Sequence, residues 1–320
     1  MVNLVRIILV LFDKPFDDLQ PGDNSMKLTA NIARGVFLLS LLLLINYPLM
    51  SSEKQKHDSR KKIKVFILAG QSNMEGRADA NKLLPHDLER LSKVQAKVQL
   101  AFNNEPVCPL KAVKPPAEIA EIYKLDAIFG PELFFGINLS EAWPDEKILL
   151  IKLSEGATSL HGSWHPEWSD DKATLMGEEQ EPKLYQALIN YVEKTLSEYK
   201  KDEYEICAML WVQGETDAGN KTAAKAYGEN LQQFISHIRQ DLENETLPFL
   251  LFQVGHGKVV EGMMEVSQRV PNVTLIKQSL DPKSVNFYSK IKNGHYNYNG
   301  MKKLGQRFAE IYLNKISTAK

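Results

Sequence analysis

From residue 63 onward, short apolar runs alternate with longer stretches in which apolar residues recur at helical spacing. The runs are continuous and rich in Val, Ile and Leu, as is typical of β-strands that are covered on both faces. They predict strands at Ile63–Ala69, Val98–Phe102, Ile148–Leu153, Ile206–Val212, Phe249–Val254 and Val273–Ile276. Because strands that alternate with helices usually lie parallel, we expect a parallel sheet with helices packed against it.

Three of the intervening stretches carry an apolar stripe of the kind that a helix turns toward a core. The predicted helices are Leu184–Leu196, with Pro182 at its start, Tyr227–Leu242 and Met301–Tyr312. Segments 75–92, 103–127 and 156–181 lack this spacing and are rich in polar residues or prolines, so we expect loops over one edge of the sheet. Ligands of such sheets bind where loops leave the C-terminal ends of the strands.

The N-terminal part follows a different order. Two basic residues lead into an apolar core at 36–45, and a polar stretch follows. This order is typical of a secretory signal peptide, and the core is shorter than the roughly 20 residues of a membrane span. We expect residues 1–50 to hold an over-called start and then, from a true start at Met26, a signal peptide, with an uncleaved membrane anchor as the alternative. Residues 51–62 would form a linker and residues 63–318 a secreted or periplasmic domain.

The charge balance and the cysteines limit the classes of partner. With 39 basic and 40 acidic residues, the chain has no charge excess that would favour a polyanion, so we expect no nucleic-acid partner. Two cysteines are too few for a disulfide scaffold. Cys207 lies in an apolar run, and we expect a buried thiol that packs as a small hydrophobe. Neither the charge balance nor the cysteine count indicates the oligomeric state.

A serine stands directly after the first predicted strand. Ser72 lies between Gln71 and Asn73, where the free backbone N–H groups of a starting helix can face an anion. Such donors also suit an oxyanion. The alternative is that the serine merely caps a helix, which is the commoner role for an isolated serine at this position.

Two further polar clusters lie at corresponding positions. In the segment 213–217, after the fourth predicted strand, Gln213 can donate a side-chain N–H and Glu215 can orient a base, whereas Asp217 can also simply cap the next helix. His295 precedes the last helix and can titrate near neutral pH, although six other histidines are present. The order of serine, glutamine with glutamate, and histidine follows the logic of nucleophile, oxyanion donor and base.

In these segments the chain resembles the SGNH hydrolases, and within them the carbohydrate acetyl esterases of the sialate O-acetylesterase and acetylxylan esterase kind. The similar blocks are Gly70–Met74, Phe129–Leu133, Ser154–Leu160 with Trp164, Trp211–Asp217 and His295. The resemblance spans residues 63–315. It implies a flavodoxin-like three-layer α/β/α sandwich with a central parallel sheet, the SGNH hydrolase fold.

The resemblance also implies a role for each motif residue. Ser72 would be the acylated nucleophile and His295 the general base. The oxyanion would be held by the backbone N–H groups of Ser72 and Gly156 and by the side chain of Gln213. Contacts with the substrate would come from Gln71, Asn73 and Trp164. The implied reaction is hydrolysis of O-acetyl groups from a carbohydrate such as a sialate or xylan, through an acetyl-serine intermediate. It needs no cofactor, and no metal-ligand spacing is present.

The chain departs from the family pattern at two positions. The family usually carries an acid three residues before the base histidine, where this chain has Lys292, and Ala157 replaces the second glycine of its block. A lysine cannot accept the histidine Nδ1–H, so we expect Glu215 to supply the missing carboxylate. The alternative is a catalytically impaired carbohydrate-binding relative, with Trp164, Trp168 and Tyr296 near the cleft.

Overall fold

The computed structural model describes residues 61–318, so the expected leader and most of the linker lie outside the described part of the chain. Within it, seven strands form one sheet in the order β4-β3-β6-β1-β7-β8-β9. All neighbours pair in parallel except β3 and β4, which are antiparallel. No helix of residues 61–318 is both long and apolar enough to cross a membrane.

The six predicted strands are present with ends that differ by at most two residues. They are β1 (Ile63–Gly70), β3 (Val98–Phe102), β6 (Ile148–Ser154), β7 (Tyr204–Val212), β8 (Phe249–Phe252) and β9 (Val273–Ile276). The short edge strand β4 (Cys108–Pro109) was not predicted, nor was the separate pair β2 (Ala78–Asp79) and β5 (Ile128–Phe129). Two-residue strands leave too little sequence for an alternation to be recognised.

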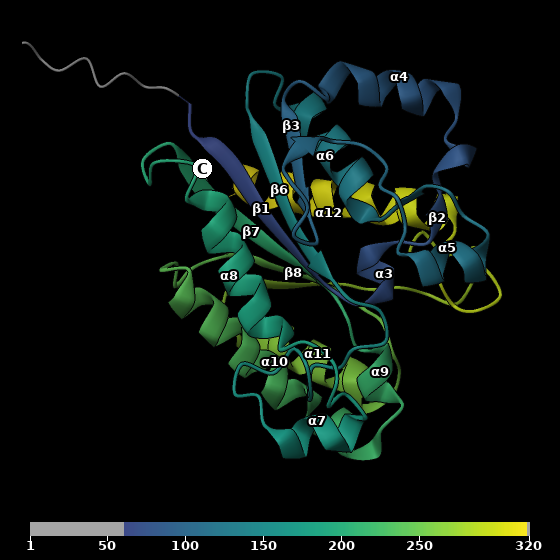
Figure 1. Ribbon diagram of the computed structural model, residues 1–320, viewed down its shortest axis with the longest axis vertical. Helices are drawn as coiled ribbons and strands as arrows, with labels where there is room; N and C mark the ends of the chain where they lie inside the picture. The colour runs from purple at the N-terminus through teal and green to yellow at the C-terminus, as the bar shows by residue number, and fades with distance from the viewer. Residues whose placement is uncertain (1–60, 319–320) are drawn as a thin grey trace, which may run out of the picture. The chain divides into compact units, whose positions relative to one another are not determined.

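Helices cover both faces of the sheet (Figure 1). One layer holds α6 (Pro131–Ala142) and α12 (Tyr298–Thr318), with α4 (Pro85–Val94) packed on α6. The other holds α8 (Leu184–Leu196), α10 (Lys221–Asp241) and α11 (Lys258–Arg269). Phe66 of β1 packs edge-on against Phe135 and Tyr312 of the first layer, whereas Trp211 of β7 packs on Phe234 of the second. The predicted three-layer α/β/α sandwich is therefore confirmed.

The segments expected to be loops contain short helices. These are α4, α5 (Ala117–Tyr123) and α7 (Asp170–Met176), together with a 3-10 turn at Ala80–Lys82. Most of these short helices bury only a few residues, so they lack the long apolar stripe by which a helix can be recognised in a sequence. Pro182 also lies two residues before α8 and is not its first residue. Cys207 is buried, as expected, and burial raises the pKa of its thiol to about 12.

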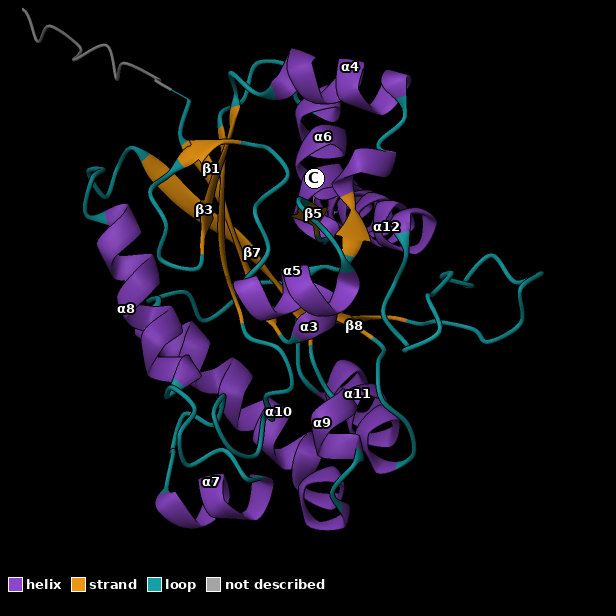
Figure 2. Ribbon diagram, turned by 45° about the vertical axis from the view of Figure 1, so that its right-hand side comes forward, coloured by secondary structure: helices purple, strands orange, loops and turns teal. Residues whose placement is uncertain are grey.

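The order of the strands explains where a site can form. The chain leaves β1 for β3, returns to β6 on one side of β1, and then crosses to β7 on the other side. The connection after β1 therefore runs toward β3 and the connection after β7 runs in the opposite direction toward β8, which opens a crevice at the carboxyl ends of these strands. The short helices α3 (Ser72–Glu75), α5 and α9 (Glu215–Ala218) gather around this edge (Figure 2).

Candidate active site

A cleft of about 800 Å³ opens at the carboxyl edge of β1, β6 and β7. Ser72 and His295 line it together with Glu215, and the loop after β6 contributes Glu155 and Gly156. A second hollow of about 500 Å³ lies between the end of α8 and the start of β7. It contains none of the predicted site residues, so the first cleft is the candidate active site.

The backbone at the end of β1 places Ser72 at the start of a helix. Gly70 has φ +146°, and a Cβ atom there would lie 2.1 Å from the carbonyl oxygen of Val212, so only glycine fits. Gln71 then caps α3 without a side-chain hydrogen bond, and Ser72 is the first helical residue. Its hydroxyl is not used as a cap. The Oγ atom lies instead 2.9 Å from Nε2 of His295, so the capping interpretation is wrong.

His295 reaches Ser72 from the long loop between β9 and α12. Its Nδ1 atom lies 3.1 Å from Oδ1 of Asn293 and 3.2 Å from the hydroxyl of Tyr123, which belongs to α5. The rings of Tyr123 and His295 also meet edge to face. Burial and the nearby cations Arg77 and Lys290 lower the pKa of His295 to about 4. The imidazole is therefore neutral at neutral pH and can accept the serine proton.

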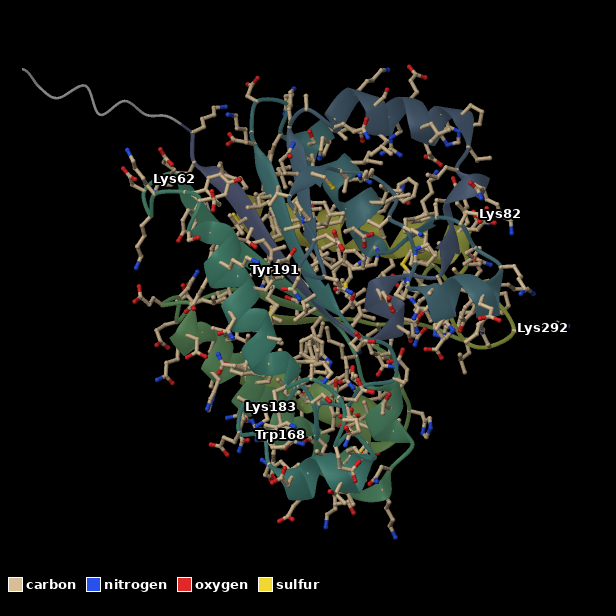
Figure 3. All side chains as sticks on the ribbon, in the orientation of Figure 1. Lys62, Lys82, Trp168, Lys183, Tyr191 and Lys292 are labelled. Atoms are coloured by element: carbon tan, nitrogen blue, oxygen red, sulfur yellow. The ribbon has the colours of Figure 1, made fainter. Side chains whose placement is uncertain are left out.

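Glu215 does not take the place of the missing acid. Its Oε1 atom accepts a hydrogen bond from Nδ2 of Asn73 at 2.7 Å, and its other oxygen is buried without a partner. Burial raises the pKa of this carboxyl. The expectation that Glu215 accepts a hydrogen bond from Nδ1 of His295 is thus wrong, because Asn73 holds the carboxylate and other groups occupy Nδ1. Lys292 is exposed and lies at the outer margin of its loop (Figure 3).

The expected oxyanion donors are only partly brought together. A Cβ atom on Gly156 would lie 3.8 Å from Cβ of Ser72, so the backbone of the β6 loop runs beside Ser72. Gln213, in contrast, is fully buried and donates through Nε2 to Asp217 at 2.6 Å and to the carbonyl of Thr158 at 3.0 Å. Its amide faces the protein and does not line the cleft, so the role expected for the Gln213 side chain is wrong.

Gln71, unlike Gln213, lines the cleft. Its Oε1 atom accepts hydrogen bonds at 3.3 Å from Nε2 of Gln213 and from the backbone N–H of Thr216. Because both of these hydrogen bonds use the amide oxygen, the NH2 group is the part of the Gln71 side chain that remains to donate. Gln71 lines the cleft beside Ser72, whereas both polar atoms of Asn73 are engaged, by Glu215 and by the backbone N–H of Tyr296.

Two buried carboxylates fix the loop that carries Gly156. Asp217 accepts hydrogen bonds from the backbone N–H groups of Leu160 and His161 as well as from Gln213. Glu178 accepts from the backbone and hydroxyl groups of Ser159 and Ser163. Burial raises the pKa of Asp217 to about 6. Asp217 is therefore not the cap of α10, which is Asn220, but a brace between the β7 and β6 loops.

A second buried network lies beneath α3, the short helix that begins at Ser72. Lys152 of β6 donates to Oε2 of Glu132 at 2.5 Å and to the carbonyl of Glu75 at 3.0 Å. Arg77 is paired with Glu75 at 2.6 Å. Lys152 was not predicted as a site residue, because a lysine inside an apolar strand gives no sign of its partner. The Phe129–Leu133 block supplies that partner in Glu132.

The aromatic residues expected at the cleft lie elsewhere. Trp164 is fully buried, packs edge-on against Trp211 and donates its indole N–H to Thr158, so its predicted contact with substrate is wrong. Trp168 lies under Nζ of Lys183 (Figure 3), and neither it nor Tyr296 lines the cleft. The aromatic residue that does line it is Tyr123.

The comparisons with known proteins agree with this geometry. A family model described as carbohydrate esterase, sialic acid-specific acetylesterase, matches residues 62–314. A probable carbohydrate esterase of Arabidopsis thaliana is 26% identical over 265 residues, which cover 79% of this chain and 91% of that protein. The crystal structure of the same plant protein has a TM-score of 0.57 at 22% identity and covers 79% of this chain and 98% of that chain.

Two further crystal structures have the same fold. A carbohydrate acetylesterase from Xanthomonas citri has a TM-score of 0.54 at 17% identity, covering 80% of this chain and 57% of that one. The structure of NanS has a TM-score of 0.58 at 14% identity, covering 81% of this chain and 99% of that one. At these identities the structures support the fold, and the family model, which spans nearly the whole described domain, supports membership. The chain therefore belongs to the family of carbohydrate esterases described as sialic acid-specific acetylesterases.

Proposed function

We propose that this chain is a serine esterase that hydrolyses O-acetyl groups from a carbohydrate through an acetyl-serine intermediate. The observation that carries the proposal is the 2.9 Å contact between Ser72 Oγ and His295 Nε2 at the wall of the cleft. A nucleophile within hydrogen-bond reach of a neutral base is the arrangement that activates a serine. We also propose that it acts in the periplasm or outside the cell, because residues 26–50 have the order of a signal peptide.

The reaction follows from these two side chains. As Ser72 Oγ attacks the acetyl carbonyl carbon, its proton passes to Nε2 of His295, and the carbonyl oxygen becomes an oxyanion. His295 then returns the proton to the sugar oxygen as the bond between that oxygen and the acetyl carbon breaks. A water molecule repeats the sequence on the acetyl-serine, releasing acetate. Backbone N–H groups of Ser72 and Gly156 are the proposed oxyanion donors, with Gln71 in place of Gln213 as the side-chain donor.

The charge of the cleft favours a neutral sugar as the substrate. Five carboxylates and two cations line it, namely Glu75, Glu118, Glu155, Glu181 and Glu215 against Arg77 and Lys290. Arg77 is already paired with Glu75, which leaves Lys290 as the cation available to an acidic sugar within this part of the structure. Burial and the neighbouring Glu75 and Glu181 raise the pKa of Glu155, so a further anion there would be repelled. An acetylated neutral glycan fits this cleft better than a sialate.

The test is hydrolysis of p-nitrophenyl acetate and of acetylated xylan oligosaccharides by wild type and Ser72→Ala. Loss of the nucleophile is expected to lower kcat by at least roughly 10³-fold. A fluorophosphonate should label the wild type at Ser72, whereas Ser92→Ala, which removes a hydroxyl on α4 that bonds only its own helix, should be labelled as the wild type is. Glycan binding with neither turnover nor labelling would instead support the carbohydrate-binding alternative.

A further inference from the structure

The position at which the family pattern described above usually has an orienting acid is a lysine in this chain. That position is Lys292, whose exposed side chain lies at the outer margin of the loop, away from the sheet (Figure 3). A catalytic histidine without a partner on Nδ1 is free to rotate and to carry its proton on the wrong nitrogen. The partner must therefore come from elsewhere, and the structure provides two groups from different parts of the chain.

The first partner is the side-chain oxygen of Asn293. It lies 3.1 Å from Nδ1 of His295 and also 3.4 Å from the backbone N–H of the same residue. A backbone N–H can only donate, so the atom that faces it is the amide oxygen and not the nitrogen. This oxygen can only accept, which requires the proton of the neutral ring to be on Nδ1. The lone pair of Nε2 is then directed at Ser72, as a general base needs.

The second partner is the hydroxyl of Tyr123, 3.2 Å from the same nitrogen. It is carried by α5, within a segment remote in sequence from the histidine. The edge-to-face contact of the two rings, with centroids 5.6 Å apart, restricts rotation of the imidazole. Because one Nδ1–H faces two acceptors, each partner can hold the ring if the other is lost.

We propose that Asn293 and Tyr123 are the positioning residues of His295, a neutral pair that replaces the acid lost at Lys292. The proposal rests on the proposed function, in which Ser72 and His295 are the catalytic pair. Neutral oxygens fix the tautomer but stabilise an imidazolium less than a carboxylate does. The charges around the ring act in the same direction. Arg77 and Lys290 face it, whereas the nearby carboxylates Glu75 and Glu215 are engaged by Arg77 and Asn73.

The consequence is a base that is weak but remains unprotonated in acid. The pKa of His295, about 4, lies well below the ordinary value of 6.5. The acid limb of the pH profile of kcat/KM is therefore expected below pH 5. A carboxylate beside Nδ1 would favour the charged ring and move this limb upward.

The experiment compares the full chain with Tyr123→Phe, Asn293→Ala, their combination, and Asn293→Asp, with Lys292→Ala as the matched control on the same loop. Each single loss is expected to lower kcat/KM for p-nitrophenyl acetate roughly tenfold, and the double variant roughly 10³-fold, because the two partners substitute for each other. Asn293→Asp should raise the apparent pKa of the acid limb by at least about one unit. Lys292→Ala should leave the profile unchanged. A double variant with the wild-type rate and pH profile would overturn the proposal.

A second measurement keeps this test separate from the test of the proposed function. The 15N chemical shifts of the imidazole, assigned by comparison with His295→Gln, report the tautomer and the pKa of His295 without any turnover. The wild type is expected to carry its proton on Nδ1, and the double variant to be a mixture of tautomers. If the wild type shows the Nε2–H form, or if the variants leave the tautomer unchanged, the positioning role is refuted. Loss of all esterase activity with the expected tautomers would refute only the proposed function.

Discussion

The buried ion pair beneath α3 gives a prediction whose size can be worked out. Lys152 and Glu132 are both fully buried, and Nζ of the lysine has two hydrogen-bond partners, the carboxylate of Glu132 and the carbonyl of Glu75. Burial lowers the pKa of Lys152, and Glu132 opposes that shift. Glu132→Ala would leave a buried ammonium with one neutral partner. Removing one member of such a pair typically costs about 3–5 kcal/mol of unfolding free energy.

The unfolding free energy that Glu132→Ala can lose has an upper limit that depends on pH, because Lys152 can release its proton. Deprotonating a lysine with an ordinary pKa of 10.5 costs about 5 kcal/mol at pH 7 and about 2 kcal/mol at pH 9. The unpaired charge cannot lower the unfolding free energy of the variant by more than this cost of deprotonation. At the upper end of the range of about 3–5 kcal/mol, the deficit relative to wild type should shrink by about 1.4 kcal/mol for each pH unit between 7 and 9. At the lower end it should begin to shrink above about pH 8.

Urea denaturation of wild type and variant, followed by tryptophan fluorescence at pH 7, 8 and 9, measures this deficit. The double variant Glu132→Ala with Lys152→Met removes both charges, so it should recover much of the stability lost at pH 7. The matched surface control is Glu89→Ala, which breaks the exposed pair with Lys93 and should cause no measurable change. A deficit below about 1 kcal/mol at pH 7, or one that stays constant up to pH 9, would refute the reasoning.

Three other predictions concern the loops and the cleft. Asp217 has a folded-state pKa of about 6, above its ordinary 3.8. The stability gained from its protonation is therefore complete below pH 3.8 and is lost as the pH rises through 6. Asp217→Asn should abolish this dependence of stability on pH in melting curves recorded over a pH series. Ala157 has φ +60°, a left-handed conformation that disfavours a Cβ, so Ala157→Gly should stabilise the fold by about 1 kcal/mol, and a loss of stability in urea would contradict this. The methyl ester of an O-acetylated sialic acid should be hydrolysed with a higher kcat/KM than the free acid, the difference shrinking in high salt; preference for the acid would show that Lys290 recruits the carboxylate.

The patterns along the chain were sufficient for six of the seven strands of the main sheet and for selecting Ser72 and His295 as a pair that meets in the fold. Continuous runs of Val, Ile and Leu identify strands buried on both faces, because only a strand covered by two layers can be apolar at every position. The runs of β1, β6 and β7 were therefore visible with nearly correct ends. Ser72 and His295 could be named because each stands at the junction of an element with a loop, within blocks that resemble a family.

The partners of those residues were decided by tertiary structure alone. Gln213 and Glu215 have side chains that suit an oxyanion donor and an orienting acid, yet Gln213 turns inward to Asp217 and Glu215 is held by Asn73. Which of several chemically suitable groups meets the histidine depends on the path of loops that have no period in the sequence. Asn293 and Tyr123 are separated by most of the domain and become neighbours only when α5 packs beside the loop before α12. The motif blocks and the family that they resemble thus predicted that Ser72 and His295 would meet, but only the folded loops decided what holds the histidine in place.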